Sequence, residues 1–236
     1  MRGTRSAGLL ALGGIPLAAV LAVIGHLEAN DDLSPWSLTV SDFAVSDRGG
    51  VIDAAMVVLA VATAALLPAL HRAYGSASAA RRRWAQSLLA VWGGGLLLAA
   101  VVPTNEPGLP MDTAAYVHRY ASVVAFLALP AAGWLLAGPL PGAGRWLRGF
   151  ALASLALAGA MVWSAYPGGR VLIGLVERLL ILTEVGLLAT VALWLVAAGQ
   201  RRGFVAAGRR HPARTSPVSP RPVRRDSPVV TPARGA

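Results

Sequence analysis

A few ionisable side chains lie within or beside long apolar runs, where such groups are energetically costly. Glu184 lies deepest in its run, and Glu177 precedes it by seven residues. On a helix this spacing places both carboxylates on one face, about 10 Å apart along the axis, with Arg178 beside them. An acid as deep as Glu184 is either uncharged or paired with a neighbouring helix. These residues could form a proton relay, or a hydrogen bond that clamps two helices together.

His118 and Arg119 follow a proline-rich segment at 103–112. Asp112 or Thr113 is suited to cap a helix, which would place His118 about a turn and a half inside it. A histidine there could transfer protons or bind a metal near neutral pH, or simply make a structural hydrogen bond. No helix carries two histidines at ligand spacing, so the sequence specifies neither a metal site nor a cofactor.

Two further acids come from the long segment 27–52 and its end. This segment, which includes Asp42, is longer than a connection between two helices requires. Its carboxylates could bind a cation through oxygen ligands, or the segment could be a solvated acidic loop. Asp53 lies at the start of the next apolar run and could pair with Arg119 or Arg178 from another part of the chain.

The elements that position these residues are six apolar runs in a chain that is 56% hydrophobic and only 14% charged. About 20 residues of helix cross a hydrocarbon core of about 30 Å. Helices or closed barrels alone satisfy the backbone in lipid, and these runs show no alternation of period two. The sequence therefore predicts an all-α integral membrane protein with a six-helix bundle. The predicted spans are 7–26, 53–71, 84–102, 113–137, 149–166 and 177–199.

The formal net charge of +10 would ordinarily suggest a nucleic-acid partner. However, nine arginines lie in the proline-rich segment 201–236, which cannot bury enough apolar surface to fold. We therefore predict a disordered cytoplasmic tail that binds anionic lipid head groups and no nucleic acid. The alternative is that the tail only fixes the orientation of the chain. The chain has no cysteine, which excludes disulfides and thiolate chemistry.

The arginines are divided unequally between the two sides of the predicted spans. Seventeen of the 21 basic residues fall on the side of the termini and four on the other. Because cytoplasmic loops carry the excess of positive charge, both termini are predicted to be cytoplasmic, in a protein of the cell membrane. The three helical hairpins then open outward. The sequence does not decide whether the protein forms a homo-oligomer.

Three short motifs resemble a known family. The run Val102-Pro-Thr-Asn-Glu-Pro-Gly, followed by Asp112-Thr and His118-Arg-Tyr-Ala, is similar to the central signature of a six-helix prokaryotic membrane family catalogued as domain of unknown function 998. Ser41-Asp42 is similar to an acidic pair in that family, and Gly174-Leu-Val-Glu-Arg to its late Gly-x-x-(Gln/Glu)-Arg motif.

The resemblance covers about residues 7–200 and implies the six-helix architecture without implying an established activity. It favours four positions as site residues. These are Asp42, His118, Glu177 and Arg178.

The preferred interpretation is a non-catalytic membrane module, a sensor, scaffold or assembly partner, with a polar cluster at its outer face. One alternative is a small proton-coupled transporter that uses Glu184, Glu177 and His118. Such a transporter would need to dimerise. The other is an outer-leaflet lipid-modifying enzyme with Asp42 or Glu177 as base and His118 as acid or metal ligand. The enzyme hypothesis requires Asp42, Asp53, His118 and Glu177 to converge on one cavity.

Overall fold

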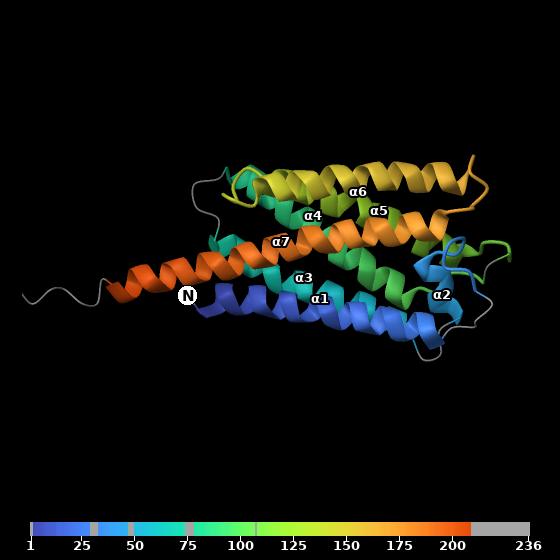
Figure 1. The fold of residues 1–236 in the computed structure, drawn as a ribbon, viewed down its shortest axis with the longest axis horizontal. Helices are drawn as coiled ribbons and strands as arrows, with labels where there is room; N and C mark the ends of the chain where they lie inside the picture. The colour runs from blue at the N-terminus through green and yellow to red at the C-terminus, as the bar shows by residue number, and fades with distance from the viewer. Residues whose placement is uncertain (1, 29–32, 47–49, 74–77, 107, 209–236) are drawn as a thin grey trace, which may run out of the picture.

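The computed structural model describes residues 2–28, 33–46, 50–73, 78–106 and 108–208. Within these residues the chain forms six long helices that run along a common axis and one short helix at the end of the bundle (Figure 1). The helices are α1 (Arg2–Glu28), α2 (Val40–Ser46), α3 (Val51–Ala73), α4 (Ala79–Val101), α5 (Thr113–Leu136), α6 (Gly144–Ala165) and α7 (Ile173–Gly208).

Six of the described helices are long and apolar enough to cross a membrane, which confirms the predicted number of spans. The spanning segments are Gly3–Leu27, Val51–Ala73, Ala79–Val101, Thr113–Leu136, Gly144–Ala165 and Ile173–Arg201. The protein is therefore a multi-pass membrane protein whose outer surface contacts the lipid bilayer.

Several helices extend beyond the apolar runs that predicted them. α4 begins at Ala79 rather than 84 and takes in three arginines, because the Ser78 hydroxyl accepts a hydrogen bond from the N–H of Arg81 at 3.3 Å and caps the helix. α6 likewise begins at Gly144 rather than 149. α7 continues to Gly208, eight residues into the segment that we assigned to the tail. The remainder of that tail, 209–236, lies outside the described residues.

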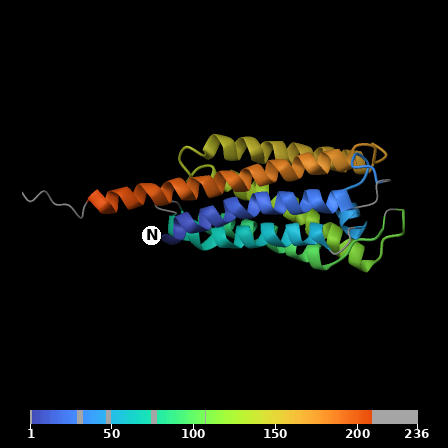
Figure 2. The same cartoon turned by 60° about the horizontal axis from the view of Figure 1, so that its bottom comes forward.

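The six long helices form a ring that follows their order in the chain. Each packs against its neighbours in sequence, and α7 closes the ring against α1. Figure 2 shows α1 lying between α7 and α3, in agreement with these contacts. The start of α1 and the end of α7 lie at one end of the bundle, hereafter the termini end, and α2 lies at the other, the α2 end (Figure 1).

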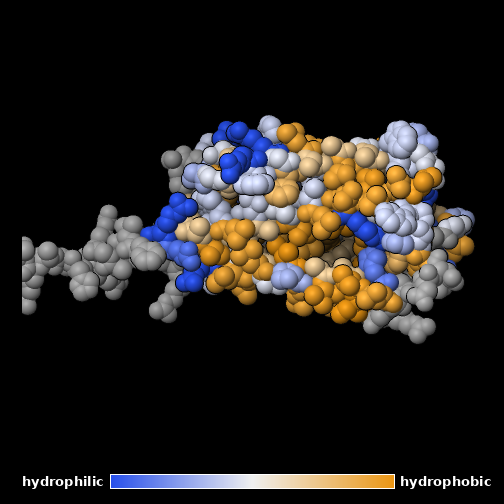
Figure 3. Space-filling model, viewed as in Figure 1, coloured by the Kyte–Doolittle hydropathy of each residue, from blue (hydrophilic) through white to orange (hydrophobic). Residues whose placement is uncertain are grey.

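The two halves of the bundle are packed differently. Most of the fully buried leucines lie on helix segments near the termini end. These are Leu66, Leu70, Leu89, Leu129, Leu136, Leu147, Leu187, Leu188 and Leu195, whereas Leu180 lies nearer the α2 end of α7. Many other Leu and Val side chains are exposed, and they form the apolar outer surface in Figure 3. A surface of this kind is expected where lipid, rather than water, surrounds the protein.

Helices α1 and α7 approach each other closely near the termini end. A Cβ atom added to Gly8 would lie 2.7 Å from the carbonyl oxygen of Ala192, and one added to Gly199 would lie 3.0 Å from the Cβ of Arg5. Small residues allow helix backbones to approach in this way within lipid. Towards the α2 end the same two helices border a cavity instead.

Candidate functional site

The first turn of α7 supports the chain segment that leads into α2. The N–H of Gly174 donates to the carbonyl of Trp36 at 3.0 Å. A Cβ atom at position 174 would collide with the carbonyl oxygens of Pro35 and Leu38. Only glycine lets this backbone rest directly on the helix, which explains its place in the Gly174-Leu-Val-Glu-Arg motif.

Arg178 follows one helical turn later and binds the same segment. Its Nη1 donates to the carbonyls of Pro35, Leu38 and Gly174, each at 2.9 Å. Its Nη2 lies 2.7 Å from Nε2 of His26, at the end of α1. A guanidinium offers several donors in one plane, so a single side chain ties together α1, α7 and the segment before α2.

The tautomer of His26 follows from two of its contacts. Its Nδ1 lies 2.6 Å from the carbonyl oxygen of Ala22, so Nδ1 carries the proton and donates it. Nε2 is then free to accept from Arg178. The imidazole also stacks on Phe43 with a centroid distance of 4.6 Å, and the Arg178 guanidinium lies 5.1 Å from the same phenyl ring. Phe43 of α2 is thereby held between two helices.

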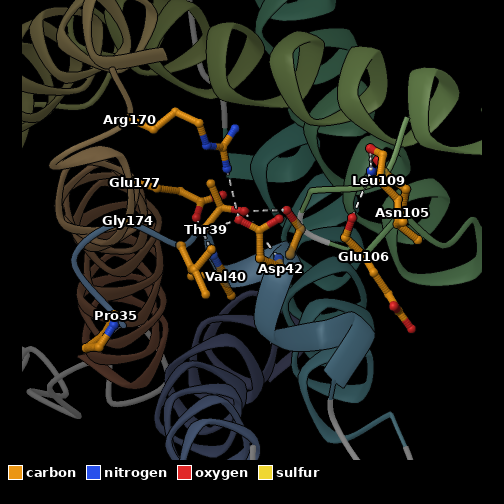
Figure 4. Close-up of polar contacts among 12 residues, drawn as sticks. Pro35, Thr39, Val40, Asp42, Asn105, Glu106, Leu109, Arg170, Gly174 and Glu177 are labelled. Atoms are coloured by element: carbon orange, nitrogen blue, oxygen red, sulfur yellow. Dashed lines mark hydrogen bonds and ion pairs between the residues drawn. The ribbon is translucent and has the colours of Figure 1, made fainter. Parts of the chain in front are cut away.

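Asp42 and Glu177 hold the start of α2 (Figure 4). The N–H of Thr39 donates to Oδ2 of Asp42 at 2.8 Å, and the N–H of Asp42 donates back to the Thr39 hydroxyl at 3.2 Å. This reciprocal arrangement is a capping box. Oδ2 of Asp42 also pairs with Arg170 at 3.2 Å, and the N–H of Val40 donates to the Glu177 carboxylate. We refer to Asp42, Arg170, Gly174, Glu177 and Arg178, with the segment 35–43 that they bind, as the polar clamp.

The other residues singled out in the sequence lie apart from the polar clamp. Asp112 caps α5 as expected, because its Oδ1 accepts from the N–H of Ala115 at 2.8 Å. The Asn105 amide closes its own loop by donating to the carbonyls of Glu106 and Leu109, away from the clamp in Figure 4. Arg119 is exposed.

Asp53 lies half-buried in the first turn of α3. Arg178 uses its donors on backbone carbonyls and on His26, and Arg119 points away from the bundle core. Neither arginine pairs with Asp53, contrary to our expectation from the sequence. The physical reason is that Gly174 lets backbone carbonyl groups approach Arg178 closely enough to accept its hydrogen bonds.

A cavity of about 490 Å³ occupies the half of the bundle towards the α2 end. Its walls come mainly from α1, α3, α4, α5 and α7, and most of the side chains are Ala, Leu, Ile, Val or Met. Six larger polar or ionisable side chains also border it. These are His26, Trp92, His118, Glu177, Arg178 and Glu184.

Glu184 lies at the deep part of this cavity and is only 1% exposed. The indole N–H of Trp92, on α4, donates to its Oε2 at 2.9 Å. The other oxygen, Oε1, is buried and has no hydrogen-bond partner within the described structure. Such an unpaired buried polar atom is uncommon and calls for an explanation.

His118, on α5, is buried at the wall of the same cavity. Its Nδ1 lies 2.8 Å from the carbonyl oxygen of Val102, so Nδ1 carries the proton. Among the residues that the structure describes, Nε2 has no hydrogen-bond partner. Oε1 of Glu184 and Nε2 of His118 thus both lie at the cavity without a partner among the described residues.

The predicted site residues therefore fall into two groups that share only two members. Asp42, Glu177 and Arg178 meet in the polar clamp, whereas His118, Glu177, Arg178 and Glu184 border the cavity. Asp42, Asp53 and Arg119 do not line the cavity. The convergence that the enzyme hypothesis requires is limited to His118 and Glu177.

The sequence analysis did not single out Trp92, Thr39 or Arg170. Trp92 lies in the middle of its apolar run, whereas tryptophans of membrane proteins concentrate at the interfaces, and that departure was a usable signal. Thr39 and Asp42 have the spacing of a capping box. Nothing local in the sequence pointed to Arg170.

Comparisons with known proteins give one match. A search of curated proteins and a search of solved structures find none. The model of a protein family described as "Protein of unknown function (DUF998)" matches residues 12–194, which include every residue of the polar clamp and every polar residue of the cavity wall. This match confirms the family that the three motifs suggested, and the chain, a multi-pass membrane protein, belongs to the DUF998 family.

Proposed function

We propose that this protein is a non-catalytic module of the cytoplasmic membrane, acting as a sensor, scaffold or assembly partner. The polar clamp fixes α2 and its preceding segment against α1 and α7. The observation that supports this role is the use of the Arg178 donors within the protein. The two terminal nitrogens of its guanidinium contact three backbone carbonyls and His26.

A catalytic acid or base must be able to exchange its proton with a substrate. In the polar clamp, Asp42 accepts from Thr39 and Arg170, and Glu177 accepts from Val40. These contacts already serve helix capping and attachment of the segment 35–43. The cluster is therefore better suited to holding structure than to transferring protons.

The proposed orientation, with both termini in the cytoplasm, rests on charge. The described arginines at the termini end outnumber those at the α2 end. Those at the termini end are Arg2, Arg5, Arg72, Arg81, Arg82, Arg83, Arg145, Arg148, Arg201 and Arg202. An alkaline phosphatase reporter fused after Ala236 should be inactive in cells, and one inserted at Gly108 should be active. The opposite pattern would reverse the proposed orientation.

The structural role of the clamp is tested by proteolysis of the purified protein in detergent. Arg178→Gln should expose the segment 33–46 to a protease at low concentration, because the carbonyls that Arg178 binds lose their donor. Arg119→Gln, an exposed arginine at the same end, is the matched control and should leave cleavage unchanged. Cleavage of Arg178→Gln at the wild-type rate would contradict the proposal.

A second candidate function, proton-coupled transport, is favoured by one observation: His118, Glu177 and Glu184 border the same cavity. Towards the termini end, however, α7 continues with Leu187, Leu188 and Val191, all fully buried among apolar side chains. A proton relay would need a second conformation that opens this half. Proteoliposomes with an imposed pH gradient test the point, since transport requires a proton flux that Glu184→Gln abolishes. An equal flux in both proteins, or none, would exclude this candidate.

A further inference from the structure

We propose that the cavity binds a single-chain lipid alcohol, an apolar chain ending in a hydroxyl group, which enters from the bilayer between α1 and α7 and hydrogen-bonds to Glu184. This inference goes beyond the proposed structural role of the polar clamp. It rests on the cavity, its opening and the unpaired atom at its deep part.

The cavity opens sideways, towards the lipid. Val23 and Leu27 of α1 and Leu182 of α7 line the cavity and are also exposed at the outer surface, at 58%, 77% and 64%. Side chains that border both spaces form the rim of an opening. Figure 3 shows a hollow with apolar side chains around it on the face where α1 and α7 lie side by side. A ligand dissolved in the bilayer reaches this opening without crossing water.

The walls fit an apolar chain better than water. A volume of about 490 Å³ lies within the range of small-molecule pockets, roughly 300–1,000 Å³. Small side chains such as Ala18, Ala55 and Ala99 form much of the wall. Buried water is stable where it finds two to four polar partners, and such a wall offers few. An alkyl chain needs no such partners.

Glu184 supplies the point of polar recognition. Oε2 is engaged by Trp92, and Oε1 is buried without a partner in the described structure. Leaving a polar atom unpaired in apolar surroundings is costly, so a ligand that pairs with Oε1 gains more there than at an exposed site. A hydroxyl can both donate and accept, and it therefore pairs with a carboxylate or with a carboxylic acid.

The charges on the wall favour a neutral head group. Arg178 borders the cavity at the α2 end and would repel a cationic ligand, whereas an anionic ligand would have to compete for its donors with the backbone carbonyls and His26 that they already bind. Moving a charged group out of water into this space would also carry a large desolvation penalty. A hydroxyl avoids both costs.

The test measures binding to the full chain in lipid nanodiscs by native mass spectrometry. Three probes share one chain length: 1-tetradecanol, tetradecane and tetradecyltrimethylammonium. The wild-type protein should bind one tetradecanol per chain, saturably and more tightly than the cation. In Glu184→Leu the preference for the alcohol over the alkane should fall about tenfold, because the variant lacks the hydrogen bond. Comparing ratios between the two proteins cancels the different partitioning of the two probes into lipid.

Two further variants keep the result interpretable. Ala55→Phe fills the cavity and should abolish binding of all three probes, whereas Ala64→Phe, on the exposed side of the same helix, should leave binding unchanged. Melting temperatures establish that each variant is folded. Glu184→Gln retains a hydrogen-bonding group and should bind tetradecanol within about threefold of the wild type.

Three results would overturn the proposal. The first is an alcohol-to-alkane preference that is the same in the wild type and in Glu184→Leu. The second is undiminished binding to folded Ala55→Phe, which would place the ligand elsewhere. The third is tighter binding of the cation than of the alcohol. None of these results bears on the protease resistance of the polar clamp, so the two proposals can fail independently.

Discussion

The polar clamp and the Glu184 cavity contain similar residue types but differ in how far these residues are hydrogen-bonded within the described structure. In the clamp, Asp42, Glu177 and Arg178 are bonded to the backbone of one short segment. In the cavity, one oxygen of Glu184 is bonded to Trp92 and the other has no partner among the residues that the structure describes. Polar groups that are fully paired within the protein hold structure, whereas those left unpaired at a cavity are available to a ligand. Substitutions should therefore reduce stability most in the clamp and least at Glu184.

The largest effect is expected for Arg178→Gln. The variant leaves the carbonyls of Pro35 and Leu38 without their shared donor and removes one of the partners of His26. The free energy of unfolding in mixed micelles should fall by about 3 kcal/mol, the scale of lost hydrogen bonds to a charged group. Arg178→Lys should recover only part of this loss, because an ammonium lacks the planar fork. Full recovery by lysine would show that the charge alone matters.

Gly174→Ala should have the next largest effect. Its Cβ would meet the carbonyl oxygens of Pro35 and Leu38 and come within 2.8 Å of Nη1 of Arg178, so the backbone must move away from α7. We expect a loss of about 1–3 kcal/mol. Gly94→Ala is the matched control, because its Cβ has nothing within 4 Å in the described structure, and it should be neutral or stabilising. Equal melting temperatures for the two variants would contradict the tight contact at Gly174.

Asp42→Ala should have a moderate effect. The substitution removes the acceptor for the Thr39 N–H and should lower the free energy of unfolding by about 1–2 kcal/mol, as for loss of a helix cap. Arg170→Gln removes only the ion pair, and the Arg170 side chain is 45% exposed. It should therefore change little. A larger loss for Arg170→Gln than for Asp42→Ala would assign the role of Asp42 to charge rather than to capping.

Glu184→Gln should have the smallest effect on stability, within about 0.5 kcal/mol of the wild type. The amide oxygen can still accept from Trp92, and the amide nitrogen replaces an oxygen that has no partner in the described chain. Chemical denaturation in the same micelles measures the difference. A loss of more than about 2 kcal/mol would remove the contrast between the two regions, because Oε1 would then have a structural partner.

The number and approximate positions of the spans follow from sequence because lipid imposes a simple length requirement on apolar helices. The helix ends do not follow, since basic turns such as Arg81–Arg83 continue a helix beyond its apolar run. α7 continues past Arg201 for the same reason.

The candidate site was predictable only in part. The motif around Glu177 and Arg178 identified the α7 side of the polar clamp. The clamp's other side consists of the backbone carbonyls of Pro35 and Leu38. Every residue has a backbone carbonyl, so the residue types do not show which carbonyls bind Arg178. The pairing of Trp92 with Glu184 depends on how α4 and α7 are rotated about their axes, which the packing of the whole ring determines.

The 36 residues of α7 make it a lever. One uninterrupted helix, about 54 Å long, carries Arg178 near one end, Glu184 further along and the arginines at 201 and 202 near the other. A rotation of about 5° about the α2 end would sweep the far end through roughly 5 Å. A ligand that tilted α7 by binding beside Glu184 would therefore move the end of this helix on the opposite side of the bilayer.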